Sequence, residues 1–310
     1  MTDDEALAHA VNALRHWGGG PAPRLIRNRE NAVFRVALPD GTPAALRLHR
    51  AGYQTDAAIR SELLWTEALA EADFPCPRPL RTDDGHILAR PAFGPRASLV
   101  TWIDAPPIGL ADAPFDGRPE AQADLYHRLG RLLLDLHRTT DALTLPADFE
   151  RPRWDLDGLT GATPLWGCFW TNPALGAPET ALLSETRDAL RAELSARPRD
   201  TGLIHADLMQ ENVLHRDGRL SLIDFDDSGF GFRLYDLGTA MVQHWRTPHR
   251  ADLAAALCDG YGRGHADLPM FTLLRALASA GWIVPRTPPG DPRQRIYAER
   301  AVTLARAWLS

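Results

Sequence analysis

The chain has 310 residues, of which 45% are hydrophobic and 24% charged, a composition typical of a globular protein with one large core or two smaller ones. Its net charge of −6 argues against non-specific nucleic-acid binding. The sequence contains no apolar run that approaches the roughly 20 residues needed to span a bilayer, and it begins without the basic-then-apolar order of a signal peptide. We therefore expect a cytoplasmic protein with neither a nucleic-acid nor a membrane partner.

Two residue types narrow the chemistry. The three cysteines are far apart and odd in number, which favours reduced thiols over a disulfide framework or a metal cluster. All 34 basic residues are arginine and none is lysine. Reactions that require a lysine are thereby excluded.

The first 103 residues are predicted to form a small β-rich lobe. In most of its segments apolar residues alternate with polar ones, as in a strand with one buried face. In two other segments the apolar residues recur every three or four positions, as in a helix. We predict helices at 4–17 and 55–72, three strands forming an antiparallel meander within 24–50, and two further strands at 86–91 and 97–103.

The residue pattern changes after residue 103. A loop rich in proline follows, and most of the later sequence has leucine at helical spacing. We place a lobe boundary here, with a β-rich lobe at 1–103 and a larger, mainly helical lobe at 104–310. The predicted fold class is α+β with two lobes.

One stretch of the helical lobe, residues 204–227, reads as two short strands joined by a tight turn. The strands are predicted at 212–215 and 220–223, and the Asp-Gly pair between them favours a hairpin. Asp207 and Asn212 precede the hairpin and Asp224 follows it, so their oxygens are expected to converge. Mg²⁺ prefers such oxygens, and a carboxylate that does not bind the metal can accept a proton.

The same stretch carries a resemblance to a known family. HADLMQEN at 205–212 matches H-x-D-x-x-x-x-N, and IDFDD at 223–227 stands where kinases place D-F-G. The chain resembles the aminoglycoside phosphotransferase family, and within it the group of the bacterial stress response kinase and the type II homoserine kinases. The resemblance implies a protein-kinase-like fold with an antiparallel sheet and one helix in the first lobe.

The resemblance also implies residue roles. Asp207 would orient and deprotonate an acceptor hydroxyl, Asn212 and Asp224 would hold Mg²⁺ against nucleotide phosphates, and His205 would brace the loop. Taken singly, these Asp and Asn residues would be read as turn formers and strand caps. Their joint spacing between short β runs favours the catalytic interpretation.

The nucleotide clamp departs from the usual pattern. The turn before the second strand has no glycine, and its Asn31 and main-chain N–H groups would have to meet the phosphates. Arg47 stands where the resemblance places a lysine, with Glu62 of the next helix as its partner. The alternative for this pair is an ordinary surface ion pair. The main chain at Thr101, Trp102 and Ile103 is expected to meet the adenine of ATP, with GTP as the alternative donor.

The acceptor is expected to be a small molecule. Only eleven residues separate Asp224 from Asp236, which leaves little room for a peptide-docking platform. An aromatic and acidic segment would suit an amine-bearing or sugar-like acceptor, or else it fills the core. Its candidate residues are Trp154, Asp155, Trp166 and Trp170.

We conclude that the sequence predicts an ATP- and Mg²⁺-dependent phosphotransferase acting on a small-molecule hydroxyl. The acceptor is left open among an aminoglycoside-like compound, an amino alcohol, a sugar and a hydroxy amino acid, and so is the choice between monomer and homodimer. Two alternatives remain: a Ser/Thr protein kinase of the stress response type, and a nucleotide-binding module with little catalysis.

Overall fold

The computed structural model describes residues 1–110, 113 and 115–310, and the chain divides into two compact units. The first unit ends three residues beyond the predicted boundary and takes in two later segments that the sequence analysis assigned to the helical lobe. The first unit consists of Met1–Pro106, Leu143–Arg151 and Ser221–Asp226, and the second of Pro107–Ala142, Pro152–Leu220 and Asp227–Ser310.

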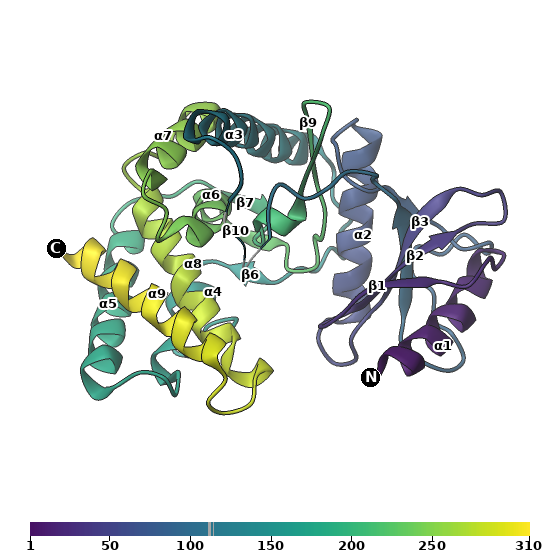
Figure 1. Cartoon of the computed structure of the whole chain (residues 1–310), viewed down its shortest axis with the longest axis horizontal. Helices are drawn as coiled ribbons and strands as arrows, with labels where there is room; N and C mark the ends of the chain where they lie inside the picture. Colours follow the sequence, from purple (N-terminus) through teal and green to yellow (C-terminus); the bar gives the residue numbers. More distant parts are fainter. Residues whose placement is uncertain (111–112, 114) are drawn as a thin grey trace. The chain divides into compact units, whose positions relative to one another are not determined.

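The first unit is built on a five-stranded antiparallel sheet with the strand order β1-β2-β3-β5-β4 (Figure 1). Alternate residues of β2 are buried, as expected for a strand with one face on a core. These buried residues pack against helix α1. The strands are β1 (Arg24–Asn28), β2 (Ala32–Ala37), β3 (Pro43–Leu48), β4 (Pro79–Leu80) and β5 (Ala97–Thr101).

Two helices belong to the same unit, α1 (Asp3–Leu14) with a 3₁₀ turn at Arg15–Trp17, and α2 (Asp56–Glu71). Each begins at a threonine side chain that accepts a main-chain N–H bond. Both predicted helices and the predicted meander are confirmed. The strand predicted at 86–91 is wrong, because only an isolated bridge from Ala89 to Ala97 forms there.

The second unit is mainly helical and also contains short strands. A three-stranded sheet has the order β6-β10-β7, and β8 and β9 form a hairpin. The segment assigned to the first unit begins within β9, at Ser221. The helices are α3 (Pro119–Ala142), α4 (Leu156–Thr160), α5 (Ala177–Ser195), α6 (Leu234–Met241), α7 (Arg250–Tyr261), α8 (Leu268–Trp282) and α9 (Pro292–Leu309). The strands are β6 (Arg153–Trp154), β7 (Thr201–Ile204), β8 (Val213–Arg216), β9 (Arg219–Leu222) and β10 (Gly229–Phe232), and short 3₁₀ turns lie at Phe169–Thr171, Gln210–Asn212, Val242–His244 and Val284–Arg286.

The predicted hairpin is confirmed with a shift of one residue. Asp217 has φ of 50° and Gly218 has φ of 77°, so both central residues of the turn are left-handed. A two-residue turn of this kind matches the twist of the strands that it joins. The Asp-Gly pair therefore fixes where β8 ends and β9 begins.

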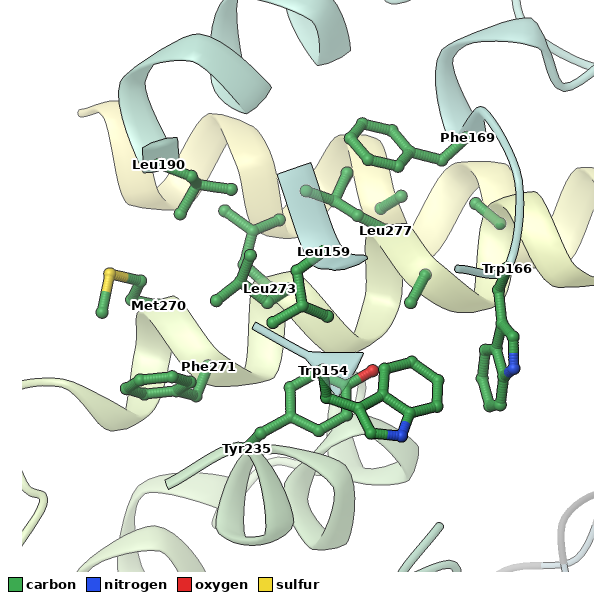
Figure 2. Packing of buried hydrophobic residues seen from close by; sticks show 14 of the residues in the cluster. Trp154, Leu159, Trp166, Phe169, Leu190, Tyr235, Met270, Phe271, Leu273 and Leu277 are labelled. Carbon is green, nitrogen blue, oxygen red and sulfur yellow. The ribbon is translucent and has the colours of Figure 1, made fainter. Parts of the chain in front are cut away.

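Helix α8 lies at the centre of the core of the second unit (Figure 2). Almost all its residues are buried, and it packs against α6 and α9. Residues 268–286 are long and apolar enough to cross a membrane, contrary to the expectation from the sequence, but 72% of this window is buried inside the protein. The segment forms the core of the unit.

Candidate functional site

The loop after β7 is held by a buried carboxylate of α6. Asp236 is fully buried and accepts hydrogen bonds from the main-chain N–H groups of His205 at 3.0 Å and Ala206 at 2.7 Å. Ala206 has φ of 65°, a left-handed conformation that costs an alanine roughly 1 kcal/mol. The two bonds to Asp236 hold the chain in this turn, which directs the next residue, Asp207.

A chain of buried side chains supports Asp236 in turn. The Nε2 atom of His137 lies 3.1 Å from an Asp236 oxygen, and its Nδ1 atom lies 2.8 Å from the Tyr261 hydroxyl. On the other side, the ring of His205 accepts a bond from the main-chain N–H of Asp207 at 3.3 Å. The loop is therefore braced by groups from α3, α6 and α7.

The Asp207 carboxylate is bonded at both oxygens. The Asn212 amide nitrogen donates to Oδ2 at 3.0 Å and also to the Asp207 carbonyl at 2.9 Å. Arg275 donates from Nη2 to Oδ1 at 2.6 Å. Each carboxylate oxygen has a further lone pair, so Asp207 can still accept a proton from a hydroxyl.

Sequence reasoning missed Arg275. In the sequence this residue is a single arginine within the apolar segment that forms α8. Only the fold shows that it contacts Asp207. Burial on its own would lower the pKa of the Arg275 guanidinium, whereas the Asp207 carboxylate and the Tyr235 hydroxyl raise this pKa above its ordinary value. The guanidinium therefore stays charged beside Asp207.

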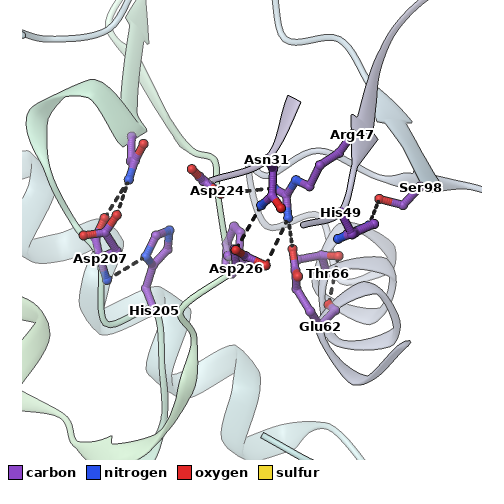
Figure 3. Close-up of polar contacts among 12 residues, drawn as sticks. Asn31, Arg47, His49, Glu62, Thr66, Ser98, His205, Asp207, Asp224 and Asp226 are labelled. Atoms are coloured by element: carbon purple, nitrogen blue, oxygen red, sulfur yellow. Dashed lines mark hydrogen bonds and ion pairs between the residues drawn. The ribbon is translucent and has the colours of Figure 1, made fainter. Parts of the chain in front are cut away.

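A second polar cluster lies in the first unit around Arg47 of β3 (Figure 3). Its guanidinium donates to Glu62 of α2 at 2.7 Å and to Asp224 at 3.1 Å, and lies 3.8 Å from an Asp226 oxygen. The structure thus brings the predicted pair of Arg47 and Glu62 together. Only 4% of the Glu62 side chain is exposed, so the pair is not a surface ion pair.

Three carboxylates share the one guanidinium of this cluster. Burial would lower the pKa of Arg47, but the carboxylates of Glu62, Asp224 and Asp226 raise it above its ordinary value. Burial and the nearby Glu62 raise the pKa of the Asp226 carboxyl to about 6. Asp226 is only 7% exposed, so this carboxyl is a buried member of the cluster.

Asn31 is held by bonds inside the first unit. Its amide nitrogen donates to Asp226 at 3.0 Å, and its amide oxygen accepts from the main-chain N–H of Arg50 at 3.0 Å. The side chain is therefore used to tie the turn to its neighbours. This differs from the expectation that Asn31 meets phosphate oxygens.

Asp224 and Asn212 have oxygens that fit a hard divalent cation. Asp224 belongs to the first unit and keeps 47% of its side chain exposed, with φ of 64° at the turn that presents it. Asn212 belongs to the second unit and uses its amide nitrogen for both of its described side-chain bonds, which leaves its amide oxygen as a ligand. Mg²⁺ usually takes one or two protein oxygens of this kind, completed by phosphates and water.

Comparison with known proteins decides the family. The phosphotransferase enzyme family, APH, matches residues 23–274. The chain belongs to this family.

Several proteins similar to this chain bear the names of small-molecule kinases. The structure of a microcompartment-associated aminopropanol kinase is similar with a TM-score of 0.82 and 30% identity, covering 97% of each chain. Amicoumacin kinase of Bacillus subtilis is 24% identical over 76% of this chain and 66% of that protein. Homoserine kinase of Beijerinckia indica is 32% identical over 56% of this chain, and the match spans 50% of that kinase. The predicted α+β fold class is confirmed, and this phosphotransferase is an enzyme of the small-molecule kinase kind.

The predicted adenine contact of this phosphotransferase lies at the end of β5. The main-chain N–H of Thr101 donates to the Arg78 carbonyl at 2.8 Å, and that of Trp102 to the Pro43 carbonyl at 3.3 Å. Both donors are therefore used inside the first unit. No described hydrogen bond uses the main-chain N–H of Ile103.

The predicted aromatic wall is part of the core. Trp154 is 1% exposed, stacks on Tyr235 with ring centroids 5.3 Å apart, and donates from Nε1 to the Asp227 carbonyl at 2.8 Å (Figure 2). Asp155 begins helix α4 by accepting the N–H of Gly158 at 3.0 Å. Trp154 thus presents no surface to an acceptor, and Asp155 is used as a helix cap at a half-buried position.

The other two tryptophans of the expected wall already carry a cation. The Arg275 guanidinium carbon lies 4.5 Å from the ring centroid of Trp166, and that of Arg187 lies 4.6 Å from the ring of Trp170. Such contacts use the ring face that would receive a substrate ammonium. In the described structure each of these two rings therefore already faces an arginine.

Proposed function

We propose that this phosphotransferase moves the γ-phosphoryl group of ATP to a hydroxyl of a small molecule, with Mg²⁺ as cofactor. One observation carries the proposal: Asp207 stands on a braced loop with Asn212 and Arg275 fixing its two oxygens. A carboxylate held in this way has one orientation in which to meet a hydroxyl, and positioning is the main contribution of a kinase to catalysis.

Asp207 is the proposed base. The acceptor hydroxyl gives its proton to the carboxylate while its oxygen forms a bond to the γ-phosphorus. The bond from that phosphorus to the bridging oxygen breaks, and ADP leaves with the electron pair. The bonds from Asn212 and Arg275 hold the carboxylate through this change of charge.

The first unit supplies the proposed nucleotide clamp. Arg47 offers the guanidinium for the phosphates, and Glu62 holds it in place from α2. Asp224 is the proposed metal ligand of this unit, and Asn212 that of the second unit. Bound Mg²⁺ would neutralise phosphate charge. The main-chain N–H of Ile103 is the proposed donor to the base of the nucleotide.

The first test is nucleotide binding by the purified protein. We expect ATP with Mg²⁺ to raise the melting temperature, and ATP without Mg²⁺ to raise it less, because a ligand that binds only the native state stabilises it. A rise in melting temperature with GTP and none with ATP would identify GTP as the phosphoryl donor. The absence of any shift at saturating nucleotide would favour a module that has lost catalysis.

The second test separates chemistry from binding. Asp207→Asn should reduce phosphate transfer by at least about 1,000-fold and leave the nucleotide-induced shift nearly unchanged. Asp157→Asn is the matched control, because Asp157 pairs with Arg191 on the surface and is 80% exposed. Transfer of label to protein serine or threonine, with no turnover on small hydroxyl compounds, would favour the protein kinase alternative.

A further inference from the structure

The turn that carries Asp224 needs support from its surroundings. Asp224 has φ of 64°, a left-handed conformation that few residues other than glycine adopt. Its side chain is 47% exposed, whereas the next two residues are buried, Phe225 at 2% and Asp226 at 7%. A strained main chain of this kind persists only where the neighbouring structure fixes it. The direction of the Asp224 carboxylate therefore depends on what holds the two buried residues.

Arg151 holds the main chain of both residues. Its Nη2 atom donates to the Asp226 carbonyl and, at 3.4 Å, to the Phe225 carbonyl. Its Nη1 atom donates to the Ala58 carbonyl of α2 at 2.9 Å. Arg151 is 6% exposed, and all these residues belong to the first unit. One rigid guanidinium therefore joins α2 to the turn that follows Asp224.

A ring contact fixes the same turn against the same helix. The ring of Phe225 packs edge-on against Trp65 of α2, with 5.2 Å between the ring centroids, and Trp65 is fully buried. Gln54, two residues before α2, donates from its side chain to the Asp226 carbonyl at 3.3 Å. Helix α2 and the residues beside it therefore set the position of the main chain after Asp224.

The segment that carries Arg151 is itself anchored to α2. The carboxylate of Glu150 accepts a bond at 2.7 Å from the hydroxyl of Thr55, the residue that caps α2. The main-chain N–H of Glu150 donates to the Ser61 hydroxyl at 2.9 Å. Residues 143–151 belong to the first unit, although the residues on both sides of this segment belong to the second. The guanidinium of Arg151 thus extends from a fixed position on the helix.

The helix that Arg151 contacts is also the helix of the proposed nucleotide clamp. Ala58 lies one helical turn before Glu62, whose carboxylate binds Arg47 at 2.7 Å. Arg47 in turn binds an Asp224 oxygen at 3.1 Å. Arg47 therefore reaches Asp224 through its side chain, while Arg151 acts on the main chain that follows it.

We propose that Arg151 is a positioning residue for the metal site, which aims the Asp224 carboxylate at Mg²⁺ by fixing the next two peptide groups to α2. The inference rests on the proposed function, in which Asp224 is a metal ligand. Replacing a residue that orients a metal ligand without touching the metal lowers metal affinity or activity by roughly 10- to 100-fold. Arg151 therefore acts on Mg²⁺ binding, and neither on metal-free nucleotide binding nor on proton transfer to Asp207.

Replacement of Arg151 tests the proposal through metal binding. The readout is the Mg²⁺ concentration that gives half of the metal-induced rise in melting temperature of the ADP-bound protein. Arg151→Met should raise this concentration at least about tenfold. Affinity for ADP without metal should stay near that of the parent protein. The Mg²⁺ dependence of turnover should shift in the same direction, and excess Mg²⁺ should restore most of kcat, which a merely structural role would not produce.

Asp224→Asn shows whether the effect passes through this ligand. If Arg151 acts through Asp224, the double variant should lose no more than about twofold in Mg²⁺ affinity beyond Asp224→Asn alone, because changes that remove one shared contribution are not additive. Multiplied losses in the double variant would place the effect of Arg151 elsewhere and overturn the inference.

Arg78→Met is the matched control. Arg78 also donates to a main-chain carbonyl of α2, that of Ala70 at 3.1 Å, but at the opposite end of the helix. This variant should keep the parent Mg²⁺ dependence. Arg151→Lys keeps the charge but has a single nitrogen in place of the fork, so it should reproduce part of the loss. It carries the test if Arg151→Met does not fold.

The possible failures can be told apart. A lowered melting temperature with parent-like Mg²⁺ affinity would leave Arg151 a role in stability alone, which would overturn this inference and keep the proposed function intact. Weakened Mg²⁺ affinity in the Arg151 variants, with no phosphate transfer by the parent protein to amino alcohols, sugars or hydroxy amino acids, would support the inference and overturn the proposed function. Nucleotide binding by the parent protein that Mg²⁺ does not strengthen would overturn both.

Discussion

Arg47 and Glu62 form a buried ion pair, with 2.7 Å between Nη1 and Oε1. The second oxygen of Glu62 is buried without a described partner, so the carboxylate depends on this arginine. Neutralising Glu62 leaves a buried guanidinium with less compensation. We expect Glu62→Gln to lower the free energy of unfolding by about 3 kcal/mol in urea titrations.

Glu67→Gln provides the control on the same helix. Glu67 pairs with Arg81 at 2.6 Å, but 44% of the Arg81 side chain is exposed. Such a pair contributes less than about 1 kcal/mol. Equal losses in the two variants would show that burial adds nothing to the Arg47 pair.

Asp236→Asn is expected to disturb the loop that carries Asp207. Asp236 accepts three bonds, from two successive main-chain N–H groups and from His137. An asparagine has one acceptor oxygen and would turn its NH₂ group toward a donor. We expect a loss of about 2–3 kcal/mol in unfolding free energy together with a fall in kcat.

Asp252→Asn, in the exposed first turn of α7, is the control for that loss. It should change neither quantity beyond about 0.5 kcal/mol. A fall in kcat with no loss of stability in Asp236→Asn would mean that Asp236 acts on the reaction rather than on the loop.

Local patterns made much of the fold predictable. Alternating apolar residues identified the meander of the first unit, and the Asp-Gly turn fixed the hairpin that separates Asn212 from Asp224. The prediction of a strand at 86–91 was wrong because this segment forms only one isolated bridge to β5, between Ala89 and Ala97. A pattern of alternation reports the burial of one face of a segment, but a strand ladder also needs a hydrogen-bonding partner that sequence does not reveal.

The site was predictable only where its residues share one stretch of chain. Asp207 and Asn212 are five positions apart, and the fold brings them into contact. Arg275 meets Asp207 across 68 positions and lies on a helix whose text predicts core. The aromatic segment was open to two interpretations because tryptophan fills cores and lines sites alike, and burial decided for the core.

Trp154→Phe tests the assignment of this tryptophan to the core. The change removes the bond from Nε1 to the Asp227 carbonyl and part of the stack on Tyr235. We expect a loss of about 2 kcal/mol in unfolding free energy. Trp170→Phe, at a half-buried position, should cost less than about 1 kcal/mol. A change in acceptor KM without loss of stability in Trp154→Phe would return this residue to the acceptor site.

Acid pH is expected to destabilise the second unit through His244. Its Nε2 atom faces the hydroxyl of Tyr126 and, at 3.0 Å, the amide nitrogen of Gln210, while its Nδ1 atom lies 3.2 Å from the Thr247 hydroxyl. An amide N–H of Gln210 directed at Nε2 requires that this nitrogen carry no proton. Burial, with a smaller contribution from His249, lowers the pKa of His244 to about 4.

The direction of the effect follows from this lowered pKa. The unfolded chain binds a proton near pH 6.5 and the folded chain does not, so the stability from neutral His244 is complete above about pH 6.5. It is lost progressively as the pH falls toward 4, by an amount on the order of 3 kcal/mol. His244→Gln should flatten the fall in unfolding free energy between pH 7 and pH 5, whereas His265→Gln, at an exposed position, should leave it as in the parent protein. A residual slope in His244→Gln is expected from the first unit, because burial and the charge of Arg47 hold the pKa of His49 well below its usual value. Identical slopes in all three proteins would mean that His244 is protonated in the folded chain, and the hydrogen bonds assigned to its ring would then have to be reversed.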